Sequence, residues 1–125
     1  MKEILDTNVL VRFLVGDTPA HQRQAEAWFE EARNRKRTLV VDPIVIAETS
    51  FVLESVYKKD RQEIADALEV FVSQRWLRVE SRRELVALWM WYRRGLHFVD
   101  SFLLAWSQIH HGEVLTFDKK LAKQS

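Results

Sequence analysis

Two acidic residues stand where an α/β protein could use a carboxylate for chemistry. Asp6 follows a short apolar stretch, Glu3-Ile4-Leu5, and a helical run from Val9 to Val15 begins just after it. Asp118 follows a second apolar stretch, residues 114–117. Open α/β sheets bind their ligands outside the carboxyl ends of the strands. If these two strands are neighbours, we expect the two carboxylates to lie side by side.

Two further acids begin helices and carry apolar neighbours. Glu48 shares a predicted helix face with Ile44 and Phe51. A carboxylate on such a stripe costs free energy unless it is hydrogen-bonded or paired with a cation. No lysine or arginine occurs between residues 38 and 56, so the partner must be distant in sequence or be a metal ion. Asp100 opens a later apolar helix in a similar way, and both acids can reach the same crevice.

The ligand chemistry of such a crevice follows from its composition. Four carboxylates repel one another unless a positive charge lies among them. The chain has no cysteine and no His-x-x-His pattern, so the ligands would all be oxygen atoms. Oxygen ligands favour Mg²⁺ or Mn²⁺ over zinc. Such ions are usually completed by water and phosphate oxygens, which points to a phosphodiester or phosphate ester as substrate.

Each acid also has a purely structural explanation when it is taken alone. Asp6, Asp100 and Asp118 each stand where they could cap a helix, because a side-chain oxygen there accepts hydrogen bonds from free backbone N–H groups. Glu48 could reach solvent from the start of its helix. Both explanations stay open on the residues alone.

Strands and helices alternate along the chain, which predicts the framework that positions these acids. This alternation is typical of a three-layer α/β fold with a mainly parallel sheet of four to five strands. We expect a single domain over residues 1–125. The predicted strands are 3–5, 38–41, 76–79 and 113–117, and the predicted helices are 9–15, 19–35, 44–57, 61–74, 82–94, 99–111 and a short segment after Asp118.

The composition narrows the class of protein further. Hydrophobic residues make up 47% of the 125 residues, which is typical of a folded domain rather than a disordered chain. The net charge is only +1, so a surface that binds nucleic acid must arise by local clustering of cations. We find neither a signal-peptide pattern nor an apolar run long enough to span a membrane. We therefore expect a cytoplasmic protein with no membrane partner.

These motifs, taken together and in order, resemble those of PIN-domain nucleases. The matching residues are Asp6-Thr7-Asn8 after the first strand, Glu48 after the second strand, Val-Asp-Ser-Phe-Leu at residues 99–103, and Thr116-Phe117-Asp118 after the fourth strand. The compact length is similar to that of VapC-type toxins from prokaryotic toxin–antitoxin pairs. The resemblance covers essentially the whole chain.

The resemblance implies a metal-dependent endoribonuclease with a site built from Asp6, Glu48, Asp100 and Asp118. Mg²⁺ or Mn²⁺, held mainly by the three aspartates, would activate a water molecule for in-line attack on phosphorus. Glu48 would complete the metal shell or orient that water. The products would carry 5′-phosphate and 3′-hydroxyl ends. The matching polar positions that would support the site are Asn8 and Thr116.

The resemblance also implies partners for the chain. RNA would be the substrate, the protein would form a homodimer, and a VapB-like antitoxin would neutralise it by occupying an apolar groove. The groove candidates on the two long apolar helices are Val52, Val56, Leu68 and Phe71, with ordinary core packing as the alternative. Arg93 and Arg94 could bind an RNA backbone, although cations are also favoured in the last turn of a helix.

Other functions and one structural departure remain open. A non-catalytic PIN-like module that binds RNA or protein would have the same fold. A Mg²⁺-dependent phosphatase would need a second acid two residues after its nucleophile, and Asn8 occupies that position. Structure-specific DNA nucleases with this fold carry long insertions that are not found here. Family members commonly add a fifth strand after the last short helix, so that strand is expected to be absent or cut from this sequence.

Overall fold

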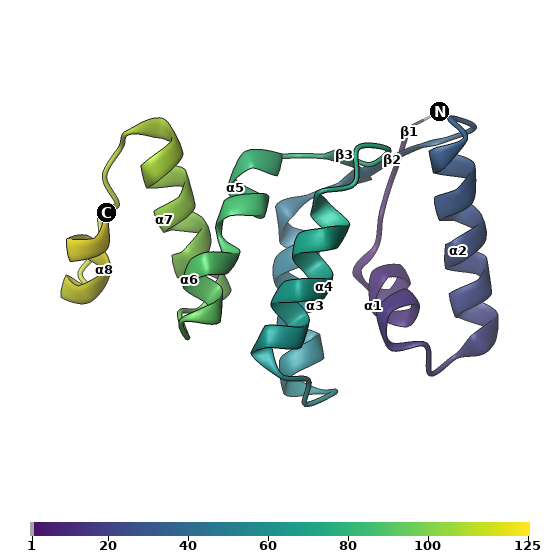
Figure 1. Ribbon diagram of the computed structural model, residues 1–125, viewed down its shortest axis with the longest axis horizontal. Helices are drawn as coiled ribbons and strands as arrows, with labels where there is room; N and C mark the ends of the chain where they lie inside the picture. Colours follow the sequence, from purple (N-terminus) through teal and green to yellow (C-terminus); the bar gives the residue numbers. More distant parts are fainter. Residues whose placement is uncertain (1) are drawn as a thin grey trace.

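The computed structural model describes residues 2–125 and has a small parallel sheet toward one end of a mostly helical molecule (Figure 1). Within those residues the sheet consists of β1 (Lys2–Ile4), β2 (Thr38–Val41) and β3 (Arg78–Val79), in the order β1-β2-β3. Both strand pairs are parallel, and Ile4 lies opposite Val40. The predicted α/β class and the parallel sheet are confirmed.

The helices appear close to their predicted positions. The predicted helix over residues 82–94 is divided by a turn at Leu88, although the N–H of Leu88 still donates to the carbonyl of Glu84. The helices are α1 (Thr7–Val15), α2 (Pro19–Arg33), α3 (Pro43–Ser55), α4 (Arg61–Val72), α5 (Arg82–Ala87), α6 (Trp89–Arg93), α7 (Phe98–His110) and α8 (Lys119–Gln124).

Local sequence signals explain where these helices begin and end. Pro19 and Pro43 occupy the first turns of α2 and α3, where a missing N–H costs nothing and the fixed φ angle suits the helix. The side chain of Asp42 caps α3 by accepting from the N–H of Ile44 at 2.9 Å. Gly16 ends α1 with φ of 71°, a conformation that glycine adopts without strain.

One hydrophobic core joins the sheet to the helices. Its fully buried members include Leu10, Phe29, Ile46, Leu68 and Trp89, which come from five different helices. None of the helices within residues 2–125 is both long enough and apolar enough to cross a membrane.

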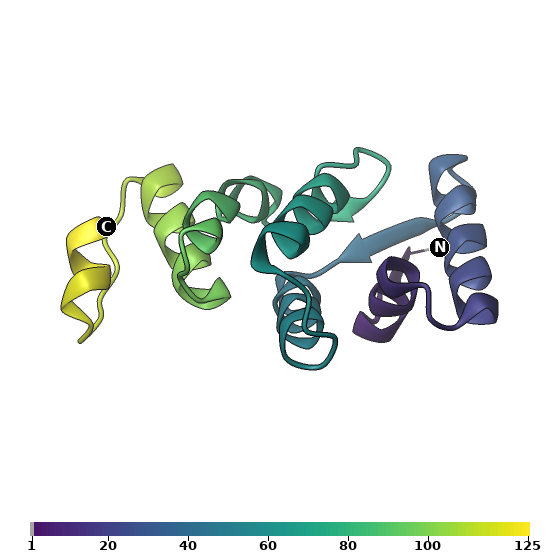
Figure 2. The same cartoon turned by 60° about the horizontal axis from the view of Figure 1, so that its bottom comes forward.

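The molecule is elongated, and its two ends carry different elements. The helices follow one another along the long axis from α2, beside the amino terminus, to α8 at the opposite end (Figure 1). The rotated view shows the same separation (Figure 2). Residues 113–125 therefore lie far from β1.

The prediction of a fourth strand at residues 113–117 is wrong in this structure. Residues 113–117 have no regular secondary structure, bend at Phe117 and pair with no strand in the part of the chain that the structure describes. Leu115 is 94% exposed and Phe117 is fully exposed. The expectation that this segment lies beside the first strand is also wrong here, because β1 pairs with β2 and the segment lies at the other end of the molecule.

Candidate active site

Asp6 lies at the carboxyl end of β1 with an exposed side chain. It occupies the N-cap position of α1, where its backbone carbonyl accepts from the N–H of Val9 at 3.1 Å. Its carboxylate makes no capping hydrogen bond with any residue that the structure describes. The capping explanation therefore does not account for this side chain, which remains accessible to a ligand.

Glu48 lies on α3 and is exposed, which agrees with the alternative that it reaches solvent from the start of its helix. The predicted stripe does exist, but Ile44 is 76% exposed and Phe51 is 67% exposed on the same helix. The half-buried acid of α3 is Glu54, which pairs with Arg61. Helix periodicity identified the correct neighbours of Glu48 but could not show that nothing covers this face of α3 within residues 2–125.

The other two acids begin the last two helices. Asp100 is half-buried in the first turn of α7, whose N-cap is His97 rather than Asp100. Asp118 is exposed and caps α8, because its Oδ1 accepts from the N–H groups of Lys120 at 2.9 Å and Leu121 at 3.1 Å. The capping explanation thus holds for Asp118 and fails for Asp100.

The supporting polar residues differ in their surroundings. Thr116 lies next to Asp118, and its Oγ1 accepts from the backbone N–H of Asp118 at 3.1 Å. Asn8 lies in a different place, where it lines a pocket of about 250 Å³ between α1 and α2 together with Arg12 and Trp28. Thr116 therefore orients one of the acids directly, and Asn8 does so for none of them.

A pocket of about 580 Å³ lies between α3, α6 and α7, and it brings two of the acid-bearing elements together. Glu48 lines this pocket from α3, and Val99, the residue before Asp100, lines it from α7. The remaining lining residues are Ile44, Ala47, Ser50, Phe51, Glu54, Arg61, Tyr92, His97 and Phe98.

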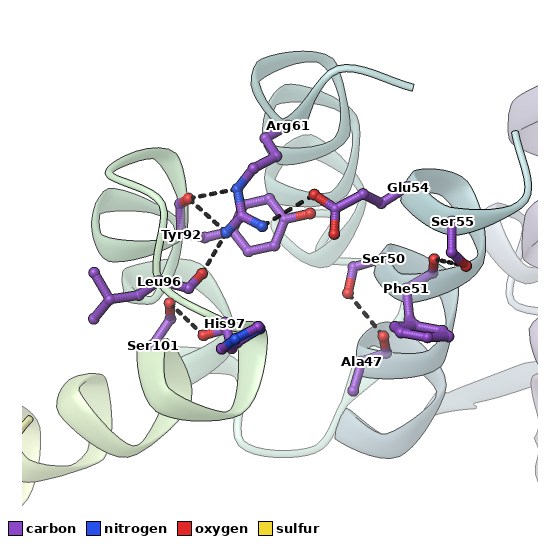
Figure 3. Close-up of polar contacts among 10 residues, drawn as sticks. All are labelled: Ala47, Ser50, Phe51, Glu54, Ser55, Arg61, Tyr92, Leu96, His97 and Ser101. Carbon is purple, nitrogen blue, oxygen red and sulfur yellow. Dashed lines mark hydrogen bonds and ion pairs between the residues drawn. The ribbon is translucent and has the colours of Figure 1, made fainter. Parts of the chain in front are cut away.

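Arg61 is the cation of this pocket and was missed by sequence reasoning (Figure 3). Its Nη1 donates to Glu54 at 3.1 Å, and its Nη2 donates to the carbonyl of Tyr92 at 2.9 Å and to the carbonyl of Leu96. The guanidinium also lies 3.9 Å from the centroid of the Tyr92 ring. A sequence signal existed, because a cation in the first turn of a helix is disfavoured by the helix dipole and needs another partner.

Tyr92 is buried beside that cation. Burial raises the pKa of the Tyr92 hydroxyl above its usual value, the positive charge of Arg61 opposes this shift, and the negative charge of Glu54 adds to it. The hydroxyl oxygen has no hydrogen-bond partner among residues 2–125.

The two arginines predicted to contact RNA have different surroundings. Arg93 donates to Asp66 at 2.8 Å and lies 2.8 Å from Glu69, and the hydrogen bond to Asp66 is the main reason that its pKa is raised. Arg94 is exposed. The charge of Arg93 is thus largely neutralised within the chain.

Two of the four residues predicted to line a partner groove are not accessible to a partner. Leu68 and Phe71 are buried in the core, as the core-packing alternative expected. Val52 is half-buried and Val56 is exposed. Only the α3 side of the predicted groove is therefore accessible.

The four acids do not form a metal site within one chain in this arrangement. Across the described range, residues 2–125, no three His, Asp or Glu side chains are close enough to hold a metal ion. Their oxygen atoms suit Mg²⁺ chemically, but Asp6 begins α1 and Asp118 begins α8, and these two helices lie toward opposite ends of the molecule (Figures 1 and 2). In this arrangement the four acids of one chain cannot bind the same divalent metal ion.

An exposed acid at the carboxyl end of a parallel strand, with further acids at helix starts, defines an α/β domain of the kind that carries a ligand site at its sheet edge. The chain belongs to the PIN domain family, whose sequence model matches residues 4–125.

Sequence comparison adds one curated relative. The chain is 32% identical over 90 residues to a protein from Aquifex aeolicus (strain VF5) named VapC ribonuclease, and the match covers 70% of this chain. It covers 66% of that relative, so the chain spans slightly less than two thirds of the relative's length. No solved structure matches the chain significantly.

Proposed function

We propose that this chain is a VapC-like endoribonuclease that depends on Mg²⁺ or Mn²⁺. Membership in the PIN domain family and the similarity to a protein named VapC ribonuclease support this proposal. The observation that carries it is Asp6, an exposed carboxylate at the carboxyl end of β1 that is not used as a helix cap by the described chain.

The reaction we propose is hydrolysis of an RNA phosphodiester. Water attacks phosphorus, the bond from phosphorus to the 3′-oxygen breaks, and the products carry a 5′-phosphate and a 3′-hydroxyl. The proposed site residues are Asp6, Glu48, Asp100 and Asp118, with Thr116 holding Asp118 in place. The all-oxygen character of this set is the reason for proposing Mg²⁺ or Mn²⁺.

A VapB-like antitoxin is the proposed regulatory partner in the cytoplasm. Val56 is an exposed apolar residue just beyond the end of α3, in the region where the sequence predicted a partner groove. Ile44 and Phe51 on α3 are exposed as well, and several exposed apolar residues on one helix support a protein partner better than a single one would.

The separation of the acids within one chain favours a second candidate function. A PIN-like module that binds RNA or protein without cleaving it would not need Asp6 and Asp118 together. The phosphatase alternative is weaker, because Asn8 stands in place of the second acid and lines a different pocket from Glu48.

Incubation with total RNA distinguishes these two functions. The purified chain should cleave RNA in the presence of Mg²⁺ or Mn²⁺ and leave 5′-phosphate ends, and a chelator should stop the reaction. Cleavage that continues with chelator would contradict metal dependence. RNA binding without cleavage in either metal would establish the binding module instead.

A further inference from the structure

The outer edge of β1 is open, and it lies directly beside Asp6. The N–H of Leu5 donates to the carbonyl of Val40 at 2.9 Å, so the backbone groups of Ile4 face the opposite, outer edge. No strand covers that edge within residues 2–125, and the Ile4 side chain is 67% exposed. An uncovered strand edge presents unpaired backbone N–H and C=O groups that can pair with another strand.

Residues 114–117 have the properties of the strand that this edge lacks. The segment is unpaired, apolar at three of its four positions and alternates between half-buried and exposed residues, and it leads into Asp118 as β1 leads into Asp6. Leu115 and Phe117 project from it into solvent. An unpaired apolar segment with the alternation of a strand and an uncovered strand edge are complementary surfaces.

The chain's own contacts hold this segment away from its own β1. Arg61 ties α4 to the carbonyls of Tyr92 and Leu96. Arg82 donates to the carbonyls of Val72 at 2.8 Å and Gln74 at 2.9 Å. These bonds fix α5 and α6 against α4, on the side of the molecule remote from β1 (Figure 1).

The same anchoring extends to α7, which leads into the exposed segment. Glu84 of α5 lies 2.9 Å from His110 at the end of α7, and the rings of Trp89 and Phe98 pack edge to face with centroids 5.8 Å apart. These contacts hold α7, and the segment that follows it, at the end of the molecule remote from β1 (Figure 1). A second copy can supply the segment without breaking them.

We propose that two copies of the chain exchange residues 113–117, so that this segment of each copy pairs in parallel with β1 of the other. The pairing that aligns the two acids places Ile4 beside Thr116 and Leu5 beside Phe117. The exchange is reciprocal and closes at two copies. Asp118 then lies beside Asp6 of the other copy, and the active site, which rests on the proposed function, is shared between chains.

Exposed apolar residues outside the sheet support a second copy of the chain as the partner that pairs with β1. Ile44 and Phe51 on α3 and Val99 on α7 are exposed near Glu48 and Asp100. We expect a copy that docks through its carboxyl-terminal segment to bury part of this exposed apolar surface. Burial of this surface adds to the few hydrogen bonds that a four-residue strand can provide.

Cysteine cross-linking tests the exchange without relying on activity. The chain has no cysteine, so Ile4→Cys/Thr116→Cys carries only the two engineered thiols. A short bismaleimide should join them between copies and give a band of twice the chain mass on a denaturing gel. The matched control Arg78→Cys/Thr116→Cys places the first thiol on β3, at the other side of the sheet, and should remain largely monomeric.

Two results of that experiment would overturn the exchange. A cross-link within one chain would show that the segment folds back onto its own β1. Equal dimer yields from the two cysteine pairs would show non-specific association. Mixing Ile4→Cys with Thr116→Cys should also give the cross-linked dimer, since each thiol then comes from a different copy.

The mass in solution provides a second readout. Leu115→Lys/Phe117→Lys changes two exposed side chains, so the single chain should fold normally but elute as a monomer. Val70→Lys alters an exposed residue of α4 and should leave the dimer intact. Circular dichroism confirms folding of both variants, and a wild-type monomer at the concentrations used for cross-linking would contradict the exchange.

Complementation tests whether the site is shared. Asp6→Asn and Asp118→Asn should each be inactive, but joint refolding should yield mixed dimers with one intact site, and about a quarter of wild-type cleavage should return. No recovery beside an active wild type would contradict a shared site. If the wild type does not cleave RNA, the proposed function fails and cross-linking still decides the exchange.

Discussion

At the scale of single residues, the acids differ in how their carboxylates are already used. Asp118 binds two backbone N–H groups of its own helix, whereas Asp6 makes no such cap within the described residues. In the sequence the two acids look equivalent, because each follows an apolar stretch and precedes a helix. Whether a carboxylate caps its helix depends on its side-chain rotamer and the local backbone, which the sequence pattern does not specify.

Tyr92 provides a prediction that depends on one atom. Its buried hydroxyl lacks a hydrogen-bond partner within residues 2–125, and phenylalanine would keep the ring that packs on Arg61. Removing a buried, unpaired polar group should leave the free energy of unfolding unchanged or raise it by about 1 kcal/mol. Urea unfolding of Tyr92→Phe measures this change.

The pH dependence of the same variant follows from the raised pKa of Tyr92. The unfolded chain loses the phenol proton at the ordinary pKa of about 10, before the folded chain does, so the wild type loses stability as pH rises above that value. The Tyr92→Phe variant should lose less stability than the wild type over the same rise in pH. Tyr57→Phe, whose hydroxyl donates to Asp17 at 3.3 Å near the surface, is the control. An equal alkaline loss in Tyr92→Phe and wild type would contradict this explanation.

At the scale of elements, Arg61 joins three helices through one side chain. Arg61→Met would remove the side-chain donor of the Tyr92 and Leu96 carbonyls and break the pair with Glu54, although the Tyr92 carbonyl would keep the N–H of Gly95. We expect a loss of about 2 kcal/mol in the free energy of unfolding, from the lost hydrogen bonds of the guanidinium and the Leu96 carbonyl that loses its side-chain donor. Urea unfolding measures it. Arg83→Met on exposed α5 surface should change stability by less than about 0.5 kcal/mol, and an equally small change in Arg61→Met would refute the anchoring role.

The elements themselves were largely predictable from sequence. Prolines at helix starts, an aspartate cap and a glycine at a helix end act within a few residues, so their signals are local. A strand also needs a neighbour, which is not a local property. Residues 113–117 have the apolar pattern of a strand, but their hydrogen-bonding partner is decided by the packing of α5 to α7, which no short window of sequence contains.

At the scale of the whole molecule, the candidate site is divided by the elongated shape. The sequence identified four acids in the order expected for a PIN domain, and one pocket brings Glu48 close to the start of α7. The prediction that all four converge stays untested at the level of function. Pairing of residues 114–117 with β1 of a second copy would reconcile the acids with the separation seen in one chain.

The most direct test of the central claim is the rate of RNA cleavage by isosteric variants of the four acids. Each single variant should lower the rate by about 100-fold or more; the four variants are Asp6→Asn, Glu48→Gln, Asp100→Asn and Asp118→Asn. The double variant Asp6→Asn/Asp118→Asn should be little slower than either of its single variants, because residues of one site act as a unit. Asparagine also caps helices well, so α8 should survive the change at Asp118. Asp60→Asn, at another exposed N-cap, is the matched control and should cleave at the wild-type rate. Wild-type rates in the four variants, or losses equal to that of the Asp60 control, would contradict a shared carboxylate site.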